Sequence, residues 1–122
     1  MEKYNITSEV AVYQDDELCA EDRELVELAK KATQQSYSPY SHFQVGAALR
    51  LEDGTIVTGS NQENASYPLA LCAERTALFH AQHEHPDKNV VALAVAAYAN
   101  GHFYPEPISP CGACRQVMLE VE

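Results

Sequence analysis

Apolar residues recur along the chain with two different periods, and each change of period marks an expected element. Leucines and alanines spaced three or four residues apart predict an amphipathic helix over Glu21–Gln35. Near alternation of apolar and polar positions predicts two strands, Phe43–Leu51 and Thr55–Ser60. The turn signal Glu52-Asp53-Gly54 lies between them. The two strands are therefore predicted to form a hairpin.

The second half of the chain continues with a helix, a strand and a helix. The first of these helices is predicted over Cys72–His83, and Val90–Tyr98 is a nearly continuous apolar run, as in a strand covered on both faces. Ser109 as N-cap and Pro110 at the first helical position predict a last helix from Cys111 to the chain end. This order predicts an α/β fold, with helices packed on a sheet whose later strands are mixed with the hairpin.

The chain divides into an N-terminal extension and one domain. Residues 1–20 are expected to be peripheral, with Thr7–Tyr13 as a short strand or an extended arm. Residues 21–122 are expected to form a single domain, because 122 residues and 13.5 kDa suit one hydrophobic core. Two further segments, Asn61–Leu69 and the stretch opened by Asn100-Gly101, are predicted to be loops.

Charge narrows the classes of partner. The chain has 18 acidic and 8 basic residues, a net charge of −10. Binding to phosphate polymers depends on lysine and arginine displacing counterions, so nucleic acid is an unfavourable partner, whereas a neutral small molecule meets no such penalty. No apolar run approaches the roughly 20 residues of a membrane span, and the N-terminus lacks a signal-peptide pattern. We therefore expect a cytoplasmic protein without a membrane partner.

Three of the four cysteines fall at predicted helix starts. Cys111 and Cys114 are three residues apart, so both sulfurs can face one metal ion, although this pair alone fits a redox centre or half of a structural zinc site equally well. Cys72 opens the preceding helix. Three thiolates leave the fourth tetrahedral position of Zn²⁺ for water, the ligand count of a catalytic site. Cys19 is interpreted as a bystander thiol.

Two charged residues, Glu74 and Arg75, lie two and three positions after Cys72. No further cysteine or histidine is clearly placed as a fourth ligand, so Glu74 is interpreted as a general acid and base beside an open zinc position. Arg75 lies three residues after Cys72 on the same helix face and is expected to hydrogen-bond to the thiolates. A surface ion pair is the alternative for Arg75.

Four segments, in order and with compatible spacing, resemble the homotetrameric cytidine deaminases over roughly residues 24 to 120. They are Ser38-Pro39-Tyr40-Ser41-His42-Phe43-Gln44-Val45-Gly46-Ala47-Ala48, Asn61-Gln62-Glu63-Asn64-Ala65-Ser66-Tyr67, Cys72-Ala73-Glu74-Arg75-Thr76-Ala77 and Pro110-Cys111-Gly112-Ala113-Cys114-Arg115-Gln116. The three-cysteine zinc signature with a non-ligand glutamate is the known signature of zinc deaminases.

The resemblance implies a role for each matching residue. One zinc ion per subunit would be bound by Cys72, Cys111 and Cys114, with Glu74 as the proton shuttle. For the nucleoside, the resemblance implies that the ring of Phe43 packs on the pyrimidine and that the side chains of Asn61 and Glu63 bind the ribose. The backbones of Ala73 and Ser109 would contact the base edge. Tyr67 would lie near a subunit interface. The alternatives are a core position for Phe43 and a simple turn for Asn61 and Glu63.

The implied function is zinc-dependent deamination of cytidine and 2′-deoxycytidine in pyrimidine salvage, with a small-molecule nucleoside as the partner. Two alternatives stay open: a deaminase of another cytosine nucleoside such as blasticidin S, which Asn61 and Glu63 disfavour, and a non-catalytic zinc-stabilised fragment.

The C-terminus departs from the family pattern. Only eight residues follow Cys114, whereas family members continue with further strands and a helix. We therefore expect the family's three-layer α/β/α fold with a mixed sheet, without its C-terminal strands. A homotetramer is expected, with a homodimer as the alternative.

Overall fold

The computed structural model describes residues 1–121. The regular elements are α1 (Ala20–Ala32), β1 (Gln44–Leu51), β2 (Ile56–Ser60), α2 (Ala73–Glu84), β3 (Val90–Ala99), β4 (His102–Phe103) and α3 (Gly112–Val121). Short 3₁₀ helices cover η1 (Asp15–Glu17), η2 (Thr33–Gln35) and η3 (Tyr67–Leu69). The predicted helices and the predicted hairpin are thus confirmed, with ends that differ by a few residues.

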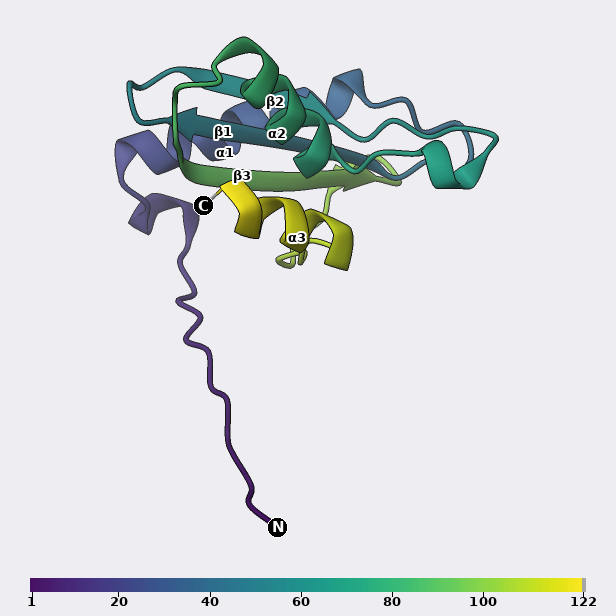
Figure 1. Ribbon diagram of the computed structural model, residues 1–122. Coiled ribbons are helices and arrows are strands. Elements are labelled where there is room, and N and C mark those ends of the chain that lie inside the picture. The colour runs from purple at the N-terminus through teal and green to yellow at the C-terminus, as the bar shows by residue number, and fades with distance from the viewer. Residues whose placement is uncertain (122) are drawn as a thin grey trace.

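A single sheet separates two helical layers (Figure 1). On one face, Leu25 and Ala29 of α1 pack against Ala48 of β1 and the alanines of β3. On the other face, the apolar residues of α2 and α3 pack against Leu49 and Leu51. This is the expected three-layer α/β/α arrangement, and it fixes the N-termini of α2 and α3 on the same side of the sheet.

The strand order is β2-β1-β3-β4, and within residues 1–121 each pair of neighbouring strands in this sheet is antiparallel. A mixed sheet was expected because a helix connects β2 to β3. Both strands pair antiparallel to β1, so β2 and β3 do run in the same direction, as a strand–helix–strand unit requires. They lie on opposite sides of β1 rather than next to each other. In the described part of the chain, the sheet therefore contains parallel strands, but no two of them are neighbours in it.

Two glycines allow the helices to approach the sheet closely. A Cβ atom on Gly46 would lie 2.1 Å from the Ala29 carbonyl oxygen in α1. On the other face, a Cβ atom on Gly59 would lie 2.5 Å from the Ala77 nitrogen in α2. Any larger side chain would push these helices outward. Gly59 in β2 thus determines how closely α2 packs on the sheet. Helix α2 carries part of the candidate site.

Two expectations about the helix and loop boundaries were wrong. The last helix begins at Gly112 and the carbonyl of Cys111 accepts the Arg115 N–H at 2.9 Å, so Cys111, and not Ser109, is the N-cap. Asn100 and Gly101 do not open an irregular loop but form a two-residue turn with φ of 56° and 85° between β3 and β4. Positive φ at both positions is the type I′ geometry that favours Asn-Gly in hairpins.

The N-terminal arm, residues 1–14, takes the extended form rather than a strand (Figure 1). It leads away from the folded body, and its residues are exposed. In the described part of the chain, no helix has the length and hydrophobicity that a bilayer span requires.

Candidate functional site

The three predicted ligand cysteines meet where two helices begin. Cys72 is the N-cap of α2, where its carbonyl accepts the Thr76 N–H at 3.0 Å. Cys111 is the N-cap of α3, and Cys114 is the third residue inside that helix. Helix N-termini carry partial positive charge and free N–H groups, which favour thiolates. Two such termini therefore converge on the same group of sulfurs.

The sulfur atoms have the spacing of a metal site. Cys111 Sγ lies 3.7 Å from Cys72 Sγ and 3.3 Å from Cys114 Sγ, and all three sulfurs lie within 4.8 Å of one another. A tetrahedron with zinc–sulfur bonds of about 2.3 Å has edges of about 3.8 Å. A disulfide needs sulfurs about 2.05 Å apart, and all three thiols are free. The donor set and its geometry therefore fit Zn²⁺.

The surroundings of Cys111 and Cys114 shift the pKa values of their thiols in opposite directions. The hydrogen bond from the Cys114 backbone N–H and the contact with the Cys114 thiol lower the pKa of Cys111, which is exposed. Burial raises the pKa of Cys114 to about 12, and its bond to Cys111 and the charge of Glu74 act in the same direction. A metal ion must displace the proton of Cys114 to bind it, so metal affinity depends on pH.

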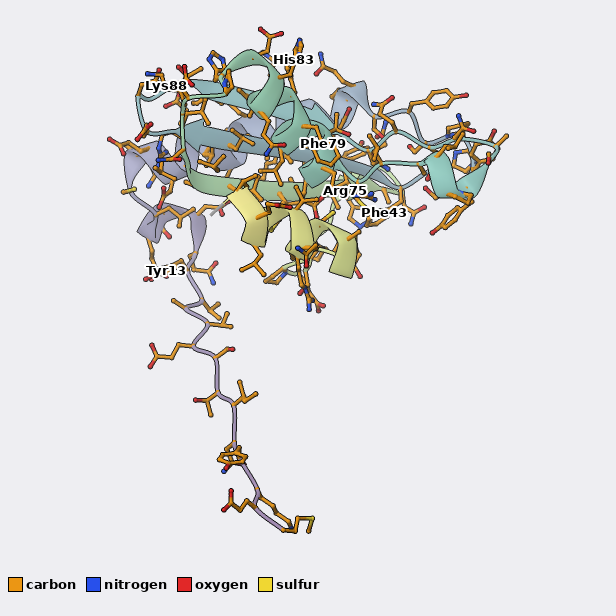
Figure 2. The ribbon with its side chains drawn as sticks, viewed as in Figure 1. Tyr13, Phe43, Arg75, Phe79, His83 and Lys88 are labelled. Carbon is orange, nitrogen blue, oxygen red and sulfur yellow. The ribbon has the colours of Figure 1, made fainter. Side chains whose placement is uncertain are left out.

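Arg75 lies against the same sulfurs. Its Nη2 donates to Cys72 Sγ at 3.6 Å, and this bond raises the pKa of Arg75. Its Nε is buried and has no hydrogen-bond partner within residues 1–121. The guanidinium thus places a full positive charge beside a cluster that becomes strongly negative when its thiols ionise. Figure 2 shows Arg75 and Phe43 near the end of the sheet where α3 begins.

Glu74 is the second residue of α2, two positions after the N-cap Cys72. Its side chain is buried, with 6% of its surface exposed. It nevertheless lines the same cavity as Cys72 and Cys111, and its charge influences Cys114. A carboxylate shielded from bulk water beside three thiols is placed to exchange protons with a small molecule in that cavity.

The cavity has a volume of about 860 Å³, within the range of small-molecule sites. It brings together every residue that the resemblance implied for nucleoside contact. Phe43, Asn61, Glu63, Tyr67, Ala73 and Ser109 all line it, with Glu74, Arg75, Cys72 and Cys111. Cys114 lies fully buried behind this surface. Tyr67 is 86% exposed at the rim of the cavity.

Asn61 is held by three hydrogen bonds within the chain. Its Oδ1 accepts from Ser36 Oγ and, at 2.8 Å, from the Val45 N–H. Its Nδ2 donates to the Phe43 carbonyl at 2.8 Å. An amide has two lone pairs and two N–H groups, so these contacts leave one N–H of Asn61, a residue of the cavity wall, without a partner within residues 1–121.

Glu63 is held by the turn that precedes β1. Its Oε1 accepts the backbone N–H groups of Tyr40 at 3.0 Å and Ser41 at 3.2 Å, and its Oε2 accepts the Ser41 hydroxyl. The Ser41 hydroxyl bond is the largest of the contributions that lower the pKa of Glu63. His42 takes the left-handed φ of 56° inside this turn, between Ser41 and Phe43.

Sequence reasoning missed the residues that hold these two side chains. Ser36 and Ser41 lie 25 and 22 positions from their partners, and no local pattern connects them. It also missed Tyr104, whose ring packs edge-to-face on Phe43 with centroids 6.0 Å apart. The sequence signal for Ser41 is its place in the Ser38–Ala48 segment, one of the four segments that carry the family resemblance.

Comparison with protein families gives one model that matches residues 19–122, described as the cytidine and deoxycytidylate deaminase zinc-binding region. Among curated proteins, the chain is similar to a cytidine deaminase from Halalkalibacterium halodurans, 53% identical over 97 residues that make up 80% of this chain and 69% of the relative. A cytidine deaminase from Sporosarcina psychrophila is 52% identical over 79% of this chain and 66% of its own length. The chain thus spans about two thirds of these relatives.

The fold is also similar to solved structures. A crystal structure of cytidine deaminase from Burkholderia pseudomallei superposes with a TM-score of 0.71 and 50% identity, over 80% of this chain and 74% of the other. A crystal structure of cytidine deaminase from Mycobacterium tuberculosis gives a TM-score of 0.69 and 43% identity, over 80% and 75% of the two chains.

Proposed function

Since the chain belongs to the cytidine deaminase family, we propose that it catalyses the zinc-dependent hydrolytic deamination of cytidine and 2′-deoxycytidine. The products are uridine or 2′-deoxyuridine and ammonia, which makes the reaction a step of pyrimidine salvage. The observation that carries the proposal is the convergence of Cys72, Cys111 and Cys114 at two helix N-termini, with Glu74 on the same cavity wall.

Cys72, Cys111 and Cys114 would hold one zinc ion per chain. When bound, zinc supplies the Lewis acidity that makes water nucleophilic near neutral pH. The helix N-termini and Arg75 offset the negative charge of three thiolates, which would otherwise repel one another.

Glu74 would carry the protons. Hydrolysis adds OH to C4 and a proton to N3 across the C4–N3 double bond of cytosine, and then breaks the bond from C4 to the exocyclic nitrogen. The carboxylate would take a proton from the attacking water and deliver it to N3. It would then carry the proton of the new C4 hydroxyl to the departing nitrogen, so that ammonia leaves as the C4 carbonyl forms. Burial of Glu74 favours this role, because a carboxylate shielded from bulk water exchanges protons with the substrate rather than with solvent.

The hydrogen-bonding groups of Asn61 and Glu63 that are still unused match those of one sugar hydroxyl. Asn61 has one N–H left to donate to a hydroxyl oxygen. Glu63 has accepting capacity left on Oε2, beside the Ser41 hydroxyl, for the hydroxyl proton. One donor and one acceptor together complement one hydroxyl group. We propose that this hydroxyl is one that both cytidine and 2′-deoxycytidine carry, so that both are substrates.

The remaining contacts would fix the base. Phe43, held by Tyr104, would pack on the pyrimidine ring, and the backbones of Ala73 and Ser109 would bond to the base edge. Tyr67, exposed at the rim, would lie at a subunit contact. We propose a homotetramer in the cytoplasm, where the free thiols of this chain are expected to stay reduced.

The proposal is tested by incubating the zinc-loaded chain with cytidine, 2′-deoxycytidine and blasticidin S and separating the products by chromatography. Uridine and 2′-deoxyuridine, formed with one equivalent of ammonia, are the expected products. Deamination of blasticidin S alone would assign the other substrate class. No turnover by a fully zinc-loaded chain would favour the non-catalytic domain.

A further inference from the structure

The Ser41 hydroxyl makes hydrogen bonds on two sides within the turn that precedes β1. It donates to Glu63 Oε2 and accepts the Phe43 N–H at 3.1 Å. A hydroxyl has one proton and two lone pairs, so a single oxygen atom can make both bonds at once. All three residues line the cavity of the candidate site. Ser41 therefore joins Glu63, which the proposed function places on the sugar, to Phe43, which it places on the base.

The backbone of Phe43 is held on its other side by Asn61. The Phe43 carbonyl accepts from Asn61 Nδ2 at 2.8 Å. The N–H of Phe43 thus bonds through Ser41 to one of the proposed sugar-binding side chains, and its carbonyl bonds directly to the other. These bonds determine where the two peptide groups that flank the Phe43 ring lie.

The turn between Ser41 and Phe43 is held by contacts from elsewhere in the molecule. His42 has a φ of 56°, a left-handed conformation that residues with a side chain rarely adopt. Such a conformation persists only where the surrounding structure enforces it. Here Glu63 Oε1 accepts the N–H groups of Tyr40 at 3.0 Å and Ser41 at 3.2 Å. The carboxylate that is proposed to bind the sugar therefore also holds the turn from which Phe43 extends.

The two segments that carry these side chains are bonded along their backbones. The Tyr37 N–H donates to the Asn61 carbonyl at 3.0 Å, and the Glu63 N–H donates to the Tyr37 carbonyl at 2.8 Å. Ser36 adds a bond from its hydroxyl to Asn61 Oδ1. The two backbones are thus fixed relative to each other, and the Ser41 hydroxyl is the part of the connection that can still rotate.

We propose that Ser41 is a positioning residue that couples binding of the sugar hydroxyl at Glu63 to the placement of the Phe43 ring on the base. The inference rests on the proposed function, which supplies these two parts of the substrate. A sugar hydroxyl that donates to Oε2 shares this oxygen with Ser41 and so acts on the Ser41 hydroxyl directly. Consecutive hydrogen bonds polarise one another, so a change at Glu63 reaches the Phe43 N–H through Ser41. Loss of either end should therefore weaken the contribution of the other.

Backbone NMR of the zinc-loaded protein tests the connection without any substrate. Glu63→Gln keeps the shape of the side chain and removes its charge, and Ser41→Ala removes the hydroxyl between Glu63 and Phe43. We expect Glu63→Gln to move the Phe43 amide proton resonance at least about threefold further in the wild-type background than in the Ser41→Ala background. Equal displacements in the two backgrounds would mean that the change reaches Phe43 by another route, and would overturn the inference.

Turnover of cytidine by the zinc-loaded protein tests the coupling in the reaction. The values of kcat and KM are measured for Glu63→Gln, Phe43→Leu and the double variant, each with Ser41 and with Ser41→Ala. With Ser41 in place, we expect the loss of kcat/KM in the double variant to be at least about threefold smaller than the product of the two single losses. With Ser41→Ala, the single losses should multiply. Coupling carried by the substrate itself persists in both sets, so the difference between the sets belongs to Ser41.

Two further variants separate the hydroxyl from the fold of the turn. Ser41→Thr keeps a hydroxyl at an exposed position and should restore both the resonance displacement and the coupling. Ser38→Ala removes a hydroxyl that lies outside this chain of bonds and should behave like the wild type. Coupling of the same size with Ser41 and with Ser41→Ala would overturn the inference. Absence of cytidine turnover by the zinc-loaded wild type would instead overturn the proposed function on which the inference rests, and it is measured before any variant is compared.

Discussion

The Sγ atoms of Cys72 and Cys111 lie 3.7 Å apart although the residues are 39 positions apart in the sequence. Each is the N-cap of a different helix, α2 or α3. The two positive helix ends therefore point at the same small volume, which favours ionised thiols there. A metal bound at this point joins two helices that pack on one face of the sheet. The site and the stability of that layer are thus linked.

Replacing any one of the three converging cysteines should remove the metal. In Cys114→Ser, the tightly bound zinc content is expected to fall from one to near zero per chain, and the melting temperature should fall with it because metal binding contributes to folding. Zinc content is measured by mass spectrometry of metal-loaded, desalted protein. Cys19→Ser is the matched control, since this thiol lies outside the cluster. Equal zinc content in the two variants would disprove the ligand set.

Arg75 should strengthen metal binding through its contact with Cys72. Its Nη2 contacts the sulfur at 3.6 Å, and loss of such a partner lowers metal affinity by about 10–100-fold. We expect this loss for Arg75→Ala and a smaller one for Arg75→Lys, which keeps the charge but not the planar fork. Competition with a chelator measures the affinity. Arg50→Ala removes an arginine that pairs with Asp22 instead and should leave zinc binding unchanged.

Ser41 should control the protonation of Glu63. The hydrogen bonds from Ser41 and Tyr40 lower the pKa of the carboxyl from its ordinary value of 4.5. A lowered pKa in the folded state means that these bonds stabilise the fold above the ordinary pKa and are lost as the pH falls through the lowered value. In Ser41→Ala the pKa should rise toward 4.5, measured by carbon NMR titration of the side chain. Ser38→Ala, which removes a hydroxyl from the same turn, should leave it unchanged.

Gly59 should be intolerant of any side chain. A Cβ atom there would meet the backbone of Ala77 at 2.5 Å, and overpacking of this kind costs about 1–3 kcal/mol. Gly59→Ala should therefore lower the free energy of unfolding measured with denaturant. Gly112→Ala is the control, because a Cβ atom at that position meets nothing within 4 Å. A stability equal to that of the control would contradict the close packing of α2 on β2.

The periodic elements could be predicted because local patterns determine them. The alanines and leucines of α1 and the apolar run of β3 follow such patterns. The errors occurred where a boundary depends on one residue. Pro110 following Ser109 suggested a helix start that is in fact two residues later, at the cap formed by Cys111. The turn at Asn100 and Gly101 had a local signal for a hairpin, which was interpreted as a loop.

The sequence predicted which residues form the site, but not the contacts that hold their side chains in place. The spacing of Cys111 and Cys114, together with Cys72 at another helix start, predicted a shared metal, and the structure places the sulfurs of Cys111 and Cys114 3.3 Å apart. The support of Glu63 by Ser41 depends on how the loops before β1 and after β2 meet, which tertiary packing determines. No sequence pattern within one element can predict such a contact.

The most direct test compares the turnover of cytidine by the wild type with that by Glu74→Gln at equal zinc content. Both are loaded with zinc, the metal content is measured, and the conversion of cytidine to uridine is followed by absorbance. The account predicts equal zinc content, because Glu74 is not among the converging thiols, and turnover about 10²–10⁴-fold lower in the variant, because the proton carrier is gone. Undiminished turnover by Glu74→Gln with its zinc in place would contradict the account.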